Sequence, residues 1–200
     1  MDLYEIIGNK MIENKNWKIK KFNSPFKHWI IEGFLSESEC SHIIKHIIAQ
    51  KFNRKDCDLF QFYQGEDLKK TKSTILKDFH KYFSSKDFIN EISEITGKEG
   101  ILKTIDMSPF IYDSTDYLLP HDDRLEGRKI AYILYLNALE DVEKGNSGGT
   151  LDLFENKKVV KRIKPKAGNL VLFEVSDKSL HQVSEVISGR RITLAGWFHA

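Results

Sequence analysis

A histidine and an aspartate two residues apart have the types and spacing of metal ligands. His121 and Asp123 lie in the stretch LPHDDRLEGRK, between two apolar segments. If 129–137 is a strand and the chain entering it is extended, side chains two residues apart point the same way, so His121 and Asp123 face one point while Asp122 points away. A third candidate ligand, His181, follows the apolar run NLVLFEV and a short turn, and can therefore lie at the mouth of the same core.

Two histidines and one carboxylate suit more than one metal. On three coordination positions they form the facial triad of non-haem iron(II) oxygenases, which leaves positions open for a cosubstrate and oxygen. Zinc is an alternative, because catalytic zinc sites use the same donors. A third interpretation is an ordinary solvated loop, since an HxD pair often arises by chance and the chain has seven histidines.

Arg191, ten residues after His181, is a candidate anion clamp. On an extended segment Arg191, Thr193, Ala195 and Trp197 share one face. An inward arginine needs an anionic partner because an unpaired buried charge is costly, and the small Thr193 and Ala195 leave room for a ligand carboxylate. A guanidinium fork and a hydroxyl suit the distal carboxylate of 2-oxoglutarate. An internal ion pair or a surface position is the alternative for Arg191.

Two tyrosines are candidates for the same anion site. Tyr135 has the inward parity of Ala131 and Ile133, and Tyr112 precedes His121 by nine residues. A phenol hydroxyl could complete the clamp on a carboxylate, or the ring could simply pack in the core.

Composition limits the class of protein. The chain has 200 residues, of which 40% are hydrophobic and 30% charged, and a formal net charge of +2. These values are typical of one soluble globular domain, so we expect a single domain over residues 1–200. A protein whose main task is to hold a nucleic-acid backbone usually has a stronger basic excess clustered on one face, so the net charge argues against nucleic acid as a partner.

The sequence also predicts a compartment. The first ten residues, MDLYEIIGNK, lack the basic and apolar regions of a secretory signal, and the longest apolar run, 130–136, is too short to cross a bilayer. Two cysteines are too few for a disulfide framework. We therefore expect an intracellular protein with reduced thiols and no membrane association.

The two halves of the chain differ in periodicity. Helices are predicted at 36–50, where Ser36 and Glu39 form a capping-box pattern, at 73–83 and at 85–97. Later, short apolar runs separated by turn residues indicate a sandwich, barrel or jelly roll. These runs are 101–113, 129–137, 148–155, 158–168, 169–175, 181–187 and 190–199.

This change predicts the organisation of a mainly β protein with flanking helices, an α+β class. Residues 1–24 form an N-terminal extension, about 25–100 helical support with a long loop, and about 101–200 the β core, with the helices packed on one face. The loop at 53–72 is aromatic, charged and aperiodic. We expect it to be a lid over the substrate or a disordered insertion.

Several stretches give the chain a specific resemblance. They read HDDRLEGRKIAYILYLN, GGTLDLF, LVLFEVSDKSLHQVSEV and RRITLAGWFH, while PFKHWIIEGFL and DLFQFYQGEDLKK extend the similarity over about residues 25–200. In this order they closely resemble the ribosomal prolyl hydroxylase branch, of the termination-and-polyadenylation protein type, of the 2-oxoglutarate and iron(II)-dependent oxygenases.

The resemblance implies a fold, a site and a reaction. The fold is a double-stranded β-helix of the jelly-roll type, flanked by helices. Residues that match the family's iron ligands are His121, Asp123 and His181, and those that match its 2-oxoglutarate contacts are Arg191, Tyr112 and Tyr135. The implied activity is hydroxylation at C3 of a proline in the decoding-centre protein of the small ribosomal subunit, with Fe(II), 2-oxoglutarate, O2 and ascorbate, in the cytoplasm or nucleus. Eukaryotic members also carry a second, non-catalytic domain of the same architecture.

Three other functions stay open. The chain could hydroxylate C4 of proline, act as an oxygenase on nucleic acid, or be a cupin-like jelly roll that binds without turnover, since a fold does not establish a function. The intact ligand set and Arg191 count against the binding module. The oligomeric state is not predicted by the sequence.

Overall fold

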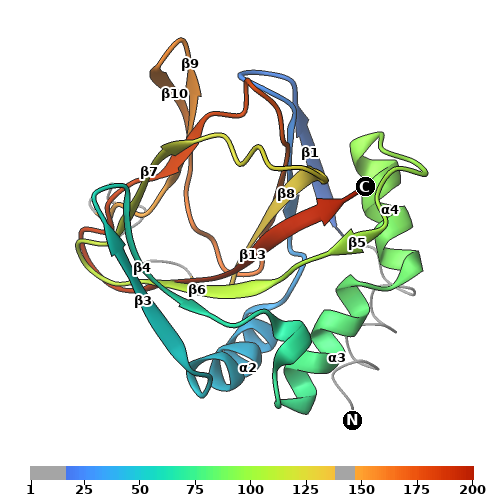
Figure 1. Ribbon diagram of the computed structural model, residues 1–200, viewed down its shortest axis with the longest axis vertical. Coiled ribbons are helices and arrows are strands. Elements are labelled where there is room, and N and C mark those ends of the chain that lie inside the picture. Colours follow the sequence, from blue (N-terminus) through green and yellow to red (C-terminus); the bar gives the residue numbers. More distant parts are fainter. Residues whose placement is uncertain (1–16, 138–146) are drawn as a thin grey trace.

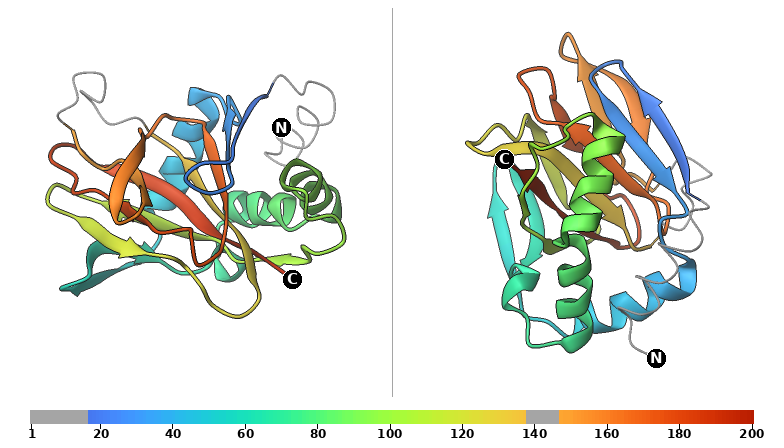
Figure 2. Two further views of the ribbon diagram at one scale, coloured as in Figure 1. Left: turned by 90° about the horizontal axis from the view of Figure 1, so that it is seen from above. Right: turned by 90° about the vertical axis from the view of Figure 1, so that its right-hand side faces the viewer.

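The computed structural model describes residues 17–137 and 147–200. In these residues thirteen strands pair antiparallel in one sheet that curls into a half-barrel, with three α-helices against one outer face (Figures 1 and 2). The helices are α2 Glu37–Ile48, α3 Thr74–Phe83 and α4 Lys86–Thr96, with a 3₁₀ turn η1 at Leu68–Lys70. The strands are β1 Lys18–Phe22, β2 His28–Glu32, β3 Phe52–Cys57, β4 Phe60–Gly65, β5 Thr104–Ile105, β6 Ser108–Tyr112, β7 Tyr117–His121, β8 Arg128–Tyr135, β9 Leu151–Glu155, β10 Lys158–Ile163, β11 Leu170–Glu174, β12 His181–Val183 and β13 Arg191–His199.

The three predicted helices are confirmed, each with a cap and a buried stripe. Ser36 and Glu39 make the predicted capping box at the start of α2. The side chains of Ser73 and Ser85 accept backbone hydrogen bonds at the starts of α3 and α4. The buried faces of the helices join the largest core cluster together with residues of β2, β8, β11 and β13. In the described part of the chain, no helix has the length and apolar character of a membrane span.

The strand order explains which strands meet at the interior. It is β1-β2-β11-β8-β13-β6-β4-β7-β12-β9-β10, with β3 paired to β4 and β5 to β13. Inside the curl, residues of β8 and β11 pack against residues of β9 and β10 in a second core cluster. Strands β8 and β13 thus bury one face against the helices and present the other to the interior. This is the predicted jelly-roll core with helices on one outer face.

The prediction of a long loop at 53–72 is wrong. That stretch forms the strand pair β3 and β4, followed by η1. On its other side β4 pairs with β6, through Tyr63 and Gln64, and with β7, through Phe60 and Gln61. The charged strand β3 is exposed along most of its length, so it lacks the alternation by which a half-buried strand is recognised.

Strands are also not confined to the C-terminal half. Of the predicted N-terminal extension, Lys18–Phe22 forms β1 at one edge of the sheet, whereas residues 1–16 lie outside the described residues. The assignment of residues 1–200 to a single domain remains a prediction.

Gly168 connects the helical layer to the sheet. Its carbonyl accepts a hydrogen bond from the Leu35 amide, and its amide donates to the Tyr135 carbonyl. Its φ is +76°, and an added Cβ would lie 1.9 Å from the Leu35 carbonyl oxygen. Gly100 has a similar φ of +72°, but an added Cβ there would meet nothing within 4 Å.

We expect Gly168→Ala to lower the free energy of unfolding by at least about 2 kcal/mol and Gly100→Ala by only about 1 kcal/mol. Both alanines adopt a left-handed backbone, but only the first also clashes. Urea unfolding followed by circular dichroism measures both values. Equal losses in the two variants would contradict a steric role for Gly168.

Candidate active site

The pairing of β7 with β12 brings the two predicted histidines together. His181 is the register partner of His121, and their ring centroids are 4.2 Å apart. Each Nδ1 meets the carbonyl oxygen two residues earlier, that of Leu119 at 2.9 Å and that of Ser179 at 2.7 Å. Because a carbonyl only accepts, we assign the proton to Nδ1 in both rings, which leaves both Nε2 lone pairs available to a cation.

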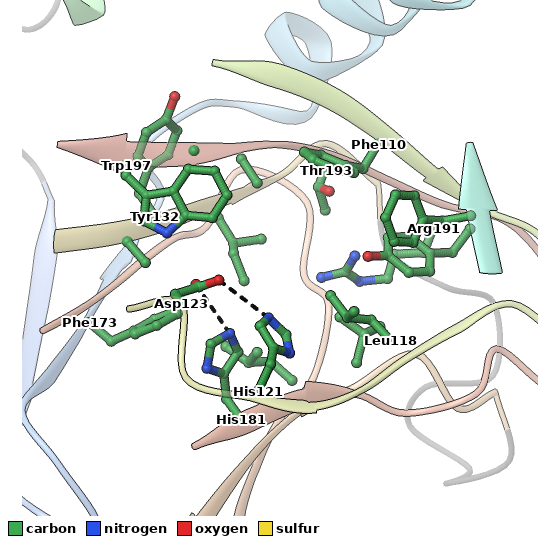
Figure 3. Close-up of a pocket in the computed structure, with 18 of the residues that line it drawn as sticks. Phe110, Leu118, His121, Asp123, Tyr132, Phe173, His181, Arg191, Thr193 and Trp197 are labelled. Carbon is green, nitrogen blue, oxygen red and sulfur yellow. Dashed lines mark ion pairs between the residues drawn. The ribbon is translucent and has the colours of Figure 1, made fainter. Parts of the chain in front are cut away.

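Asp123 completes the group. The Nε2 atoms of His121 and His181 each lie 3.4 Å from a different carboxylate oxygen of Asp123 (Figure 3). One ligand atom from each of the three residues lies within 4.8 Å of the others, so together they could hold one metal ion. Asp122 points away, as predicted, and accepts a hydrogen bond from Arg124 Nε at 2.8 Å.

The extended backbone that was predicted between His121 and Asp123 is not observed. Strand β7 ends at His121, and Asp123 lies in the following loop with a φ of +63°, so the chain is not extended between them. A left-handed backbone is unfavourable for residues other than glycine, although aspartate and asparagine tolerate it best. The carboxylate therefore reaches the histidines through a turn that strand parity does not describe.

Arg128 and Trp197 hold Asp123 in this conformation. Nη1 of Arg128 donates to the Asp123 carbonyl at 3.3 Å, and the guanidinium carbon lies 3.3 Å from the centre of the Trp197 ring. The indole nitrogen of Trp197 faces Asp123 and is buried without a hydrogen-bond partner among the described residues (Figure 3). One arginine thus fixes both the backbone of Asp123 and the ring beside its carboxylate.

Burial and mutual charge set the ionisation of the group. Burial, with the neighbouring His121, lowers the pKa of His181 to about 4, so this ring is neutral near pH 7. Burial opposes charge on His121 and Asp123 as well, but their attraction outweighs it, which raises the pKa of His121 and lowers the pKa of Asp123. Metal binding needs deprotonated donors, and the neutral His181 and ionised Asp123 already provide them.

Arg191 is a buried cation in the same cavity. The four positions of β13 predicted to share a face all line it: Arg191, Thr193, Ala195 and Trp197. Arg191 is 2% exposed, and its guanidinium lies 4.9 and 5.2 Å from the ring centres of Tyr112 and Tyr135. Its Nε and the Tyr135 hydroxyl are buried without hydrogen-bond partners among the described residues. Such groups are costly unless a ligand pairs with them, so the site fits an anion.

The tyrosines remain neutral in this setting. Burial raises the pKa of Tyr112 and of Tyr135, against the opposing charge of Arg191. Each phenol therefore keeps its proton and can donate it in a hydrogen bond to a carboxylate held by Arg191.

The three candidate metal ligands, Arg191 and Tyr112 line one cavity of about 240 Å³ with mainly apolar walls, whereas the predicted contact Tyr135 is buried behind Arg191 and is not part of the lining. Phe62 of this wall belongs to the aromatic stretch that was expected to act as a lid over the substrate, although that stretch is a strand and not a loop. Other wall residues were missed in the sequence: Gln64, Phe110, Leu118 and Phe173. Phe110 could have been found, because it has the same parity as Tyr112 on β6.

The fold and the site define a class of enzyme, and comparison with known proteins gives the same class. Residues 107–199, which include His121, Asp123, His181 and Arg191, match the family described as the 2OG-Fe(II) oxygenase superfamily. Over this segment the chain is similar to members of the 2OG-Fe(II) oxygenase superfamily. The family implies Fe(II), 2-oxoglutarate and O2, and so favours iron over the zinc alternative.

Particular relatives carry more specific names. The chain is 40% identical to "Prolyl 3-hydroxylase OGFOD1" of Mus musculus over 184 residues, which are 88% of this chain and 33% of that protein. It is 31% identical to "Prolyl 3-hydroxylase sudestada1" of Drosophila melanogaster over 190 residues, 89% of this chain and 35% of that protein. The chain thus spans about a third of the length of these relatives. A solved prolyl-4-hydroxylase of Pseudomonas putida has a TM-score of 0.68 over 98% of both chains at 17% identity, a likeness of fold alone.

The two neighbouring aspartates provide a matched test of the metal site. We expect Asp123→Asn to weaken binding of Mn(II) by more than the roughly 10- to 100-fold that loss of an outer-sphere partner costs, because a ligand oxygen is replaced by a neutral amide. Asn tolerates the left-handed backbone, so the loop should persist. Asp122→Asn should leave affinity within about threefold of the wild type, since the Asp122 side chain is outside the group. Isothermal titration calorimetry distinguishes the two variants, and similar affinities would contradict the assignment.

Proposed function

We propose that the chain is an iron(II)- and 2-oxoglutarate-dependent dioxygenase that hydroxylates a prolyl residue of a protein. One observation carries the proposal: two histidine Nε2 atoms and a carboxylate converge in the same cavity as the buried Arg191, which has no carboxylate partner among the described residues. The first element suits a divalent metal, and the second suits the distal carboxylate of 2-oxoglutarate. A zinc hydrolase or a binding module has no need of both.

In this proposal each residue has a defined task. His121, Asp123 and His181 would hold Fe(II), which when bound couples the decarboxylation of 2-oxoglutarate to succinate with insertion of oxygen into a C–H bond. Arg191 pairs with the distal carboxylate, and the hydroxyl of Thr193 is the nearest further donor on the same face. The apolar walls of the cavity exclude water, which strengthens that ion pair and limits side reactions.

The substrate proposal rests on the apolar wall of the cavity and on the named relatives. Phe62, Phe110 and Leu118 form an apolar part of that wall, which suits a proline ring and its neighbours in a peptide. By analogy with the prolyl 3-hydroxylases OGFOD1 and sudestada1, the carbon attacked is C3. By the resemblance described above, the substrate is the decoding-centre protein of the small ribosomal subunit. Ascorbate then serves as a reductant, and the enzyme works in the cytoplasm or nucleus.

The proposal is tested by incubating the protein with Fe(II), 2-oxoglutarate, ascorbate and a peptide spanning the decoding-centre loop. We expect the peptide to gain the mass of one oxygen atom. A peptide with deuterium at C3 of the target proline should lose one deuterium, whereas deuterium at C4 should be retained. Loss from C4 instead would identify a prolyl 4-hydroxylase. Absence of succinate, with or without peptide, would favour the non-catalytic binding module.

Substitution of Phe62 in the β3–β4 hairpin should affect peptide binding without affecting the reaction of 2-oxoglutarate. We expect Phe62→Ala to lower peptide hydroxylation at least about tenfold, since burial of an aromatic side chain contributes on the order of 1.5–3 kcal/mol. Conversion of 2-oxoglutarate without peptide should stay within about twofold of the wild type. Leu59→Ala, at the exposed tip of the same hairpin and outside the cavity wall, is the control. Equal loss of both activities in Phe62→Ala would mean that Phe62 only supports the fold.

Substitutions of Arg191 distinguish a 2-oxoglutarate enzyme from a jelly roll that only binds a metal. Arg191→Ala should cost on the order of 2–5 kcal/mol of 2-oxoglutarate binding, by analogy with truncated buried charge pairs. Arg191→Lys keeps the charge but loses the planar fork, so we expect an intermediate loss. Calorimetric titration of 2-oxoglutarate into the Mn(II)-loaded protein measures both, and unchanged Mn(II) affinity shows that the site is intact. Wild-type affinity in Arg191→Ala would place the clamp elsewhere.

A further inference from the structure

A row of polar side chains crosses three neighbouring strands, β12, β9 and β10, on the face of the sheet opposite the candidate metal ligands. Gln182 of β12 and Arg162 of β10 are the register partners of Asp152, which lies on β9 between them. Because side chains alternate along a strand, Gln182 points away from the face that carries His181. None of the three residues of the row lines the cavity of the candidate active site.

Asp152 is the centre of this row. The residue is only 2% exposed, yet each of its carboxylate oxygens has a partner. One oxygen accepts a hydrogen bond from the Thr150 hydroxyl at 2.5 Å, and the other accepts one from Nε2 of Gln182 at 3.0 Å. Nε of Arg162 lies 3.6 Å from the first oxygen. A buried carboxylate is destabilising unless it is paired and hydrogen-bonded, so each of these partners is needed.

Thr150 extends the network to the end of β12. Its amide and its hydroxyl each lie 2.9 Å from the hydroxyl oxygen of Ser184, and its carbonyl accepts a hydrogen bond from the Ser184 amide. Ser184 directly follows β12, which ends at Val183. The network around Asp152 therefore holds both the middle of β12, through Gln182, and the residue that follows the strand.

Strand β12 has little main-chain pairing with which to fix its own register. It has only three residues, and its pairing with β7 is irregular between His181 and Val183. A slip of such a short strand breaks few ladder bonds, so side chains must oppose it. Moving β12 by one residue along β9 would separate Gln182 from Asp152 and leave a buried oxygen without its donor. The same slip would turn His181 to the other face of the sheet.

We propose that Asp152 is a positioning residue for the metal site. By holding Gln182, it keeps β12 in the register that points His181 toward His121 and Asp123. The inference rests on one part of the proposed function, the binding of a divalent metal by these three ligands. Because the Asp152 side chain does not line the cavity, its effect passes through β12. The alternative is that the row supports only the general stability of this edge of the sheet.

The test is calorimetric titration of Mn(II) into the metal-free protein. Gln182→Met removes the donor without changing the net charge, and should weaken Mn(II) binding about 10- to 100-fold, as loss of an outer-sphere partner does. The control is Gln61→Met, which removes the same type of contact on the β3–β4 hairpin, where Nε2 of Gln61 lies 3.1 Å from an Asp56 carboxylate oxygen. It should leave the affinity within about threefold of the wild type.

A reversed pair tests whether the two side chains act on each other. Gln182→Glu alone places two carboxylates together and should weaken Mn(II) binding at least about tenfold. Addition of Asp152→Asn restores the hydrogen bond with donor and acceptor exchanged, and should return the affinity to within about threefold of the wild type. Urea unfolding of the metal-free Gln182→Met and Gln61→Met proteins should give similar stabilities, because a slip of β12 is a local event.

Each other outcome would overturn the inference. Wild-type affinity in Gln182→Met, or no recovery in the reversed pair, would mean that this contact does not place His181. A fall in the stability of metal-free Gln182→Met large enough to account for its weaker binding would leave only a general structural role. Absence of Mn(II) binding by the wild type would remove the metal site, and with it the proposed function as well. The last result is therefore distinguishable from failure of the inference alone.

Discussion

The site depends first on the register of one short strand pair. Strand β12 has three residues, yet its pairing with β7 sets His181 directly opposite His121. Both rings then find the carbonyl oxygen two residues behind them, and both turn Nε2 toward the same point. A shift of β12 by one residue would turn the His181 ring to the other face of the sheet and away from His121, so the strand register also determines whether the two histidines can share a metal.

The carboxylate is positioned by a different principle. Asp123 leaves the ladder and adopts a left-handed backbone, which is stable only because surrounding groups hold it. Arg128, at the start of the next strand, accounts for much of that support through the Asp123 carbonyl and the Trp197 ring. Two candidate ligands are thus positioned by regular strand pairing, and the third by a strained backbone that Arg128 and Trp197 support. Such departures from ideal backbone geometry are expected at functional sites.

Much of this arrangement could be predicted from the sequence. Helical spacing and caps gave α2, α3 and α4, and alternation placed Arg191, Thr193 and Trp197 on one wall. The β3–β4 hairpin was missed because its outer strand is exposed and its partners lie about 50 residues away, so no local period marks it. The turn at Asp123 was missed for a related reason, since its conformation is set by Arg128 and not by neighbours in sequence.

The double pairing of β4 has a consequence for motion near the cavity. One end of this strand is hydrogen-bonded to β6 and the other to β7, so it joins two strands that are consecutive in sequence but separated in the sheet order. Displacing the hairpin would break ladder bonds on both sides and expose Phe62 and its aromatic neighbours. Amide protons of β4 should therefore exchange with solvent only through cooperative opening of this part of the sheet. The wall proposed to receive a peptide is part of the protein's stable scaffold, so selectivity there would come from a preformed surface.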